Sequence, residues 1–179
     1  MKKILVLTHC ILNRASKVEN YDEKEIMEEN KLRSELLKEI FEKDIELLQL
    51  PCPEFTMYGS KRWGHVKEQF DNPFFRKNCK EILNPIIEQL SEYNENIEKF
   101  KILGIVAIDG SPSCGYNLTC KGEYGGELSC SHLDDKINSV IMEREAGVFM
   151  EELEMLLKEN NLNIVIRTMK DQIDYLKNL

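Results

Sequence analysis

The stretch that decides the fold is Ile102-Leu-Gly-Ile-Val-Ala-Ile-Asp-Gly-Ser-Pro-Ser-Cys-Gly115. An apolar run ends abruptly at Asp109-Gly110, and a short polar loop that carries Cys114 follows. Apolar runs of this length, rich in β-branched side chains and bounded by turn residues, are typical of strands buried on both faces. Open α/β sheets bind ligands in the loops at the carboxyl ends of such strands. The stretch therefore predicts a central strand followed by a functional loop.

Similar apolar runs predict strands at residues 3–8, 45–50 and 161–167, in addition to residues 101–108. Apolar residues recur at helical spacing over residues 23–41, 72–93 and 134–158, and residues 171–179 predict a closing helix. Asp22 is a candidate N-cap. Pro85 predicts a kink or break in the second helix, and Gly147 an interruption of the third. Residues 54–71 and 116–133 have no clean period and predict long connections.

Strands that alternate with helices predict parallel βαβ units. We therefore expect an α/β fold: a single Rossmann-like domain over residues 1–179, with a mainly parallel sheet and helices on both faces. A hydrophobic fraction of 42% and a charged fraction of 31% fit a globular protein. No apolar run approaches the roughly 18 residues of a membrane helix, and residues 1–8 favour a first strand over a signal peptide. We expect a cytoplasmic protein without a membrane partner.

The net charge of −8 argues against nucleic acid as a partner, because nucleic-acid binding needs a basic face. Six cysteines are many for a cytoplasmic chain of this size. Such cysteines stay reduced, so metal-binding or catalytic roles gain weight over disulfides.

Cys10, Cys52 and Cys114 each follow a predicted strand. Because the carboxyl ends of parallel strands share one edge of the sheet, we expect these three thiols to lie together. Three thiolates suit an iron–sulfur or zinc centre with one coordination position open to substrate. Cys120 or Cys130 is a possible fourth ligand, and neither follows a strand.

These cysteine motifs resemble those of the thiouracil desulfidase family. The resemblance rests on a first strand that ends in Cys10, on Cys52-Pro-Glu54, and on Ser111-Pro-Ser-Cys-Gly115. It implies an oxygen-labile 4Fe-4S cluster, which air exposure can remove, held by Cys10, Cys52 and Cys114, with an open iron that takes sulfur from a thiolated pyrimidine. It also implies Glu54 and Ser111 as the acid/base residues. A carboxylate can take a proton from the attacking water, and a hydroxyl can orient the ring as charge develops.

The segment after Cys-Pro-Glu departs from the family pattern. Tyr58-Gly-Ser-Lys-Arg-Trp-Gly-His65 stands where the family has Gly-Gly and Pro-Arg elements. Trp63 or Tyr58 can stack on a flat ring, Arg62 can meet a phosphate, and Arg14 echoes an Arg-Tyr-Asp element of the family. Ser113 can bond loop backbone groups or a cluster sulfide. The expected substrate-binding residues are therefore Ser113, Arg62, Trp63, Tyr58 and Arg14.

We therefore expect an enzyme, a desulfidase that is not redox-driven and acts on thiouracil or a thiouridine nucleotide, as a monomer or homodimer. The alternative is a non-catalytic iron–sulfur or zinc protein for sulfur transfer or redox sensing. A metal-free nucleotide-binding domain ranks third, because neither Gly-x-Gly-x-x-Gly nor a P-loop follows the first strand.

Overall fold

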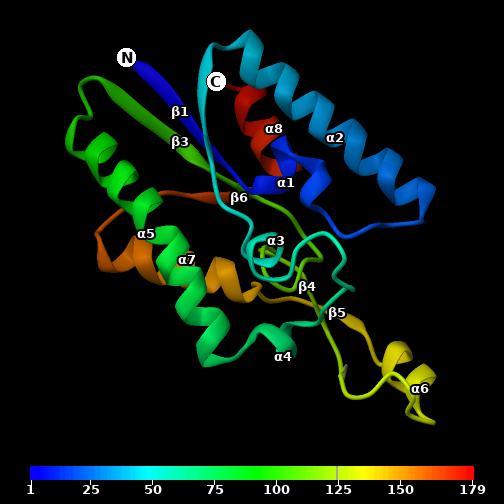
Figure 1. Ribbon diagram of the computed structural model, residues 1–179. Helices are drawn as coiled ribbons and strands as arrows, with labels where there is room; N and C mark the ends of the chain where they lie inside the picture. The colour runs from blue at the N-terminus through cyan, green and yellow to red at the C-terminus, as the bar shows by residue number, and fades with distance from the viewer. Residues whose placement is uncertain (124) are drawn as a thin grey trace.

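A computed structural model describes residues 1–123 and 125–179 and confirms the expected α/β fold (Figure 1). Its parallel sheet has the strand order β2-β1-β3-β6. The strands are β1 (Lys2–Leu7), β2 (Ile45–Gln49), β3 (Phe100–Ala107) and β6 (Ile166–Thr168). β1 and β3 are the two central strands, so the loops that follow them open at the middle of one sheet edge.

Helices cover both faces of the sheet (Figure 1). On one face α2 (Glu23–Glu42) and α8 (Met169–Lys177) pack on Leu5, Leu7 and Val106. On the other face α5 (Pro73–Glu95) and α7 (Val148–Glu159) pack on Val6 and Ile105. Successive strand residues point to opposite faces, which explains why both central strands are apolar throughout. No helix in the described part of the chain combines the length and apolar character that a membrane crossing requires.

The predicted connection over residues 54–71 is more ordered than expected. It contains α3 (Pro53–Tyr58) and α4 (Lys67–Phe70). Pro85 lies inside α5, which continues through it without a break. The predicted N-cap is confirmed, because the Asp22 carboxylate accepts from the backbone N–H groups of Lys24 and Glu25.

The interruption predicted at Gly147 is confirmed, because Gly147 is the N-cap of α7, but the prediction of a helix over residues 134–146 is wrong for most of that segment. The region predicted over residues 134–158 forms α6 (Leu133–Asn138), β5 (Ile141–Glu143) and α7, and β5 pairs antiparallel with β4 (Thr119–Lys121) inside the predicted 116–133 loop. The backbone of Gly147 is extended (φ −74°, ψ 161°), so α7 begins after it. The Gly147 N–H donates to the Gly115 carbonyl oxygen at 2.8 Å, and a Cβ atom at Gly147 would lie 2.5 Å from the Ser113 carbonyl oxygen, so a close tertiary contact keeps this residue out of the helix.

β4, β5 and α6 are here called the arm, and α6 lies well away from the sheet (Figure 1). Ion pairs fasten the base of the arm to α4 and α7. Lys121 pairs with Glu68, Glu143 and Glu145, and the buried Lys67 pairs with Glu145 and Glu151.

Candidate functional site

The three predicted cysteines lie just beyond the ends of three neighbouring strands. Cys10 lies in α1 (His9–Leu12), which follows β1; Cys52 is the N-cap of α3 after β2; and Cys114 lies in the loop after β3. All three are free thiols, with Cys10 and Cys114 buried and Cys52 half-buried. The parallel sheet thus puts them at one edge, with the Cys10 strand between the other two.

The ionisation of Cys114 is coupled to its neighbours. Burial is the main cause that raises its pKa well above the usual value, and the charges of Cys10, Glu54 and Cys52 raise it further. Burial also raises the pKa of Cys10, to about 11. These four groups therefore lie within electrostatic reach of one another. Thiols with raised pKa values become thiolates only when a cation offsets the charge.

The side chains at this edge of the sheet are not already arranged to bind a single metal ion. Among residues 1–123 and 125–179, no group of three or more His, Cys, Asp and Glu side chains is arranged to hold a metal ion. Cys120, one of the two candidate fourth ligands, is engaged elsewhere, since its S–H donates to the carbonyl oxygen of His65 at 3.1 Å. Cys130 is half-buried in the connection between β4 and α6.

Glu54 is a buried carboxylate in the first turn of α3. Its Oε1 accepts from the Ser113 hydroxyl at 2.5 Å and from the Ser111 hydroxyl at 3.4 Å. The Ser113 Oγ atom also lies 3.5 Å from Cys114 Sγ. The two residues that the family resemblance assigns to acid/base chemistry are therefore in contact, and Ser113 links them to a proposed ligand.

Arg62 holds the other oxygen of Glu54. Its Nε donates to Glu54 Oε2 at 3.2 Å, and both side chains are almost completely buried, with 4% and 9% exposed. Its terminal nitrogens donate to the carbonyl oxygens of Gly59 at 3.0 Å and Ser16 at 2.7 Å. The guanidinium thus joins Glu54 and the C-cap of α3 to the short 3₁₀ helix η1 (Arg14–Ser16).

The Cys114 loop is held by backbone contacts with the start of α7. The N–H groups of Phe149 and Met150 donate to the Ser113 carbonyl oxygen at 3.0 and 3.2 Å. Inside the loop, Ser111 Oγ accepts from the N–H of Cys114 at 3.0 Å. Hydrogen bonds at a helix N-terminus satisfy donors that have no partner inside the helix. The loop is therefore a rigid support for Cys114 and Ser113.

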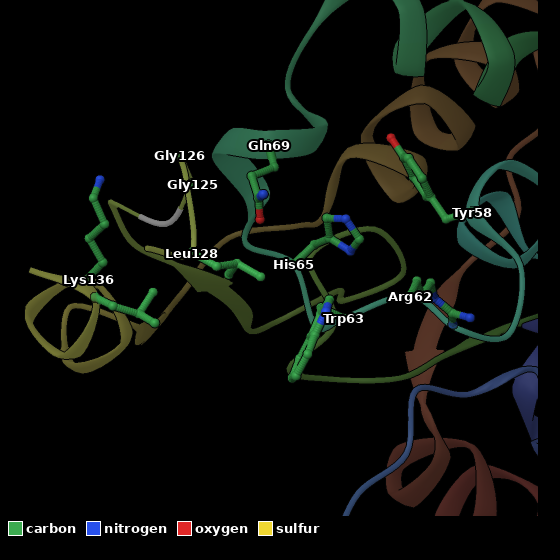
Figure 2. A pocket seen from close by; sticks show the side chains of 11 residues that line it. Tyr58, Arg62, Trp63, His65, Gln69, Gly125, Gly126, Leu128 and Lys136 are labelled. Atoms are coloured by element: carbon green, nitrogen blue, oxygen red, sulfur yellow. The ribbon is translucent and has the colours of Figure 1, made fainter. Parts of the chain in front are cut away.

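The remaining predicted residues lie on two sides of this network. Arg14, in η1, bonds the side chain of Asn30 in α2, and its Nε is buried without a partner among the described residues. Tyr58 and Trp63 line a cavity of about 400 Å³ between residues 58–69 and the arm (Figure 2). Arg62 lines the same cavity, which connects it to Glu54.

The sequence predicted three of the eleven residues that line this cavity, Tyr58, Arg62 and Trp63, and the other eight, which include His65 and Gln69, were missed. His65 stacks on Phe70 with ring centroids 4.7 Å apart and on Tyr58 at 5.0 Å. The segment has no periodic pattern, and the only available signal was its cluster of aromatic residues. The imidazole lies within reach of the charge of Glu54, although burial is the main cause that lowers the pKa of His65.

Comparisons with known proteins give the same family as the cysteine motifs at Cys10, Cys52 and Cys114. The profile of a family described as "Putative 2-thiouracil desulfurase" matches residues 1–129, which include all three cysteines and the Glu54 network. An uncharacterized protein of Methanocaldococcus jannaschii is 34% identical over 113 residues, which cover 63% of this chain and 67% of that protein. No solved structure gives a significant match. The chain belongs to the 2-thiouracil desulfurase family that this profile describes.

Proposed function

We propose that the protein is a desulfidase that removes sulfur from thiouracil or a thiouridine nucleotide, with a 4Fe-4S cluster held by Cys10, Cys52 and Cys114. When bound, the cluster would supply a Lewis-acidic iron with affinity for a thiocarbonyl sulfur. One observation carries the proposal: the Ser113 hydroxyl bonds the buried Glu54 and lies 3.5 Å from Cys114 Sγ. A proton-accepting group therefore stands beside a proposed cluster ligand.

The donor set fits a cluster better than a single zinc ion. All three donors are free, soft thiols whose pKa values are raised mainly by burial, so either centre would have to ionise them on binding, and the difference lies in geometry. A single zinc ion needs its thiolates converging on one point at about 2.3 Å, and the described residues offer no such group. The ligands of a cluster bind separate irons and need not converge in this way.

Glu54 is suited to accept a proton from water. A carboxylate has about four lone-pair positions. On Oε1 the hydroxyls of Ser113 and Ser111 occupy two, and on Oε2 Arg62 occupies one. One position on Oε2 remains, and Arg62 fixes its direction. The carboxylate would take the proton of a water that attacks the carbon of the C–S bond.

Ser111 is suited to orient the substrate ring. Its oxygen accepts from the backbone N–H groups of Cys114 and Ser113, at 3.0 and 3.3 Å. Its own proton is directed to Glu54 Oε1 in a long contact of 3.4 Å, from which it would turn to a bound ring. A hydroxyl positioned by backbone donors needs little reorganisation when charge develops on the substrate.

The test is sulfide release from 2-thiouracil by anaerobically reconstituted protein. Glu54→Gln should keep the iron content and lower the rate by about 10²-fold or more, as expected for loss of a general base. Glu152→Gln is the matched control, because Glu152 is also buried and paired with an arginine, Arg76, but lies in α7. Undiminished sulfide release by Glu54→Gln, or its equal loss in Glu152→Gln, would contradict the assignment. Iron-loaded wild-type protein that releases no sulfide would favour the non-catalytic alternative.

A further inference from the structure

The cavity lined by Arg62 and Trp63 has walls of contrasting chemistry (Figure 2). The body of the protein contributes aromatic and amide side chains, and the connection through α6 contributes apolar and basic ones. Its volume of about 400 Å³ lies in the range of small-molecule sites. The residues that matter for its chemistry are Tyr58, Trp63, His65, Gln69, Leu128 and Lys136.

The imidazole of His65 is fixed on this wall with one nitrogen uncommitted. Stacking on Tyr58 and Phe70 sets the ring plane, and the Cys120 S–H holds the backbone carbonyl. Within the described residues, Nδ1 of His65 is closed off from solvent, whereas Nε2 is accessible and makes no hydrogen bond. An accessible, unpartnered nitrogen on a residue that lines a cavity is a candidate to bind a ligand.

We propose that this cavity receives the heteroaromatic ring of the substrate, and that His65 Nε2 binds the N–C=O edge of that ring. The proposal rests on the function proposed above and adds a specificity-determining residue to it. Arg62 lines the cavity and bonds Glu54, so a single side chain separates the cavity from the proposed base.

The neighbouring side chains complement such an edge. Burial lowers the pKa of His65, which favours the neutral imidazole, and Nε2 can then accept from a ring N–H or, in the other tautomer, donate to a ring carbonyl. The Gln69 side-chain oxygen accepts from the Val66 N–H at 3.1 Å, which leaves its NH₂ group to donate to a second ring acceptor.

Trp63 supplies a face for the ring. It is 73% exposed, although it lines the cavity, and an indole is large enough to cover a six-membered heterocycle. An exposed tryptophan at the mouth of a cavity gains by stacking on a planar ligand. In such a site His65 and Gln69 would hydrogen-bond the edge of the ring, and Trp63 would stack on its face.

The experiment measures uracil binding to cluster-loaded protein by equilibrium dialysis, because uracil carries the ring edge and has no sulfur to lose. His65→Phe keeps an aromatic ring in the stack and removes both nitrogens, so the Kd for uracil should rise about tenfold, the effect of one lost hydrogen bond in a buried site. His132→Phe is the control, since this exposed histidine precedes α6 and does not line the cavity. Its Kd should match the wild type.

His65→Gln guards against a folding defect, because its side-chain amide can replace Nε2 and should restore part of the affinity. With 2-thiouracil, His65→Phe should raise KM about tenfold and leave kcat within about threefold, as expected for lost substrate binding. The inference would be overturned if the wild type did not bind uracil, or if His65→Phe bound uracil with the same Kd as the wild type. Absence of sulfide release with His65-dependent uracil binding would instead overturn the proposed reaction, so the two failures are distinguishable.

Discussion

Replacing Arg62 by methionine tests the network that holds Glu54. Both side chains are almost completely buried, and Arg62 donates to three acceptors in separate segments. Arg62→Met leaves Glu54 as an unpaired buried carboxylate. Breaking a buried ion pair in this way costs about 3–5 kcal/mol of unfolding free energy. At roughly 2–4 °C per kcal/mol for a chain of this size, the Tm should fall by about 6–20 °C.

The assay is urea unfolding of the metal-free, reduced protein, followed by circular dichroism. The double variant Arg62→Met/Glu54→Gln should recover at least about 1 kcal/mol relative to Arg62→Met, because an unpaired buried charge costs more than an unpaired amide. The exposed Arg144 supplies the control, and Arg144→Met should change stability by less than about 0.5 kcal/mol. A loss below about 1 kcal/mol in Arg62→Met, or no recovery in the double variant, would refute the reasoning.

Two further predictions concern the contact that Gly147 makes with the Cys114 loop and the protonation of His65. Gly147→Ala should destabilise the protein by about 1–3 kcal/mol in urea unfolding, because the new methyl group would lie 2.5 Å from the Ser113 carbonyl oxygen. Gly64→Ala, which meets no atom within 4 Å, should change it by less than about 0.5 kcal/mol, and equal effects would contradict this contact. Burial lowers the pKa of His65 in the folded state, so the unfolded chain binds a proton first as the pH falls. The His65 contribution to stability should be complete above its ordinary pKa of 6.5 and decrease below it, and His65→Phe should remove that part of the pH dependence of the urea midpoint.

The sheet could be predicted from the sequence because its central strands are buried on both faces. A continuous apolar run such as residues 101–108, too short for a buried helix and bounded by turn residues, favours a strand of this kind. The edge at which Cys10, Cys52 and Cys114 lie follows from the parallel βαβ pattern alone. The same reasoning placed Asp22 at the start of α2, where its carboxylate caps two backbone N–H groups.

The arm could not be predicted, because its local pattern conflicts with its tertiary contacts. Ile137 and Ile141 contribute to a helical period over residues 134–158, yet both are exposed and lie in different elements. The helix α7 begins only after Gly147, which lies against Ser113, a residue of a distant segment. Helical propensity is a weak guide where such contacts decide.

The Glu54 network was predictable only in part. The proximity of Glu54 to Cys52 is local and visible in the sequence. The bonds from Arg62 to Ser16 and from Ser113 to Glu54 join residues 46 and 59 positions apart. No periodicity encodes such pairs. Arg62 was expected to meet a phosphate, whereas the structure places its guanidinium on Glu54 and two backbone carbonyl oxygens.

The central claim is that Cys10, Cys52 and Cys114 together hold an iron–sulfur cluster. Iron and acid-labile sulfide should be measured after anaerobic reconstitution of the wild type and of single cysteine-to-serine variants. The account predicts about four irons and four sulfides per chain in the wild type. It also predicts a marked loss in each of the three variants and full content in Cys79→Ser, whose thiol is buried in the core on α5. Full iron and sulfide content after removal of any one of the three thiols would contradict the claim.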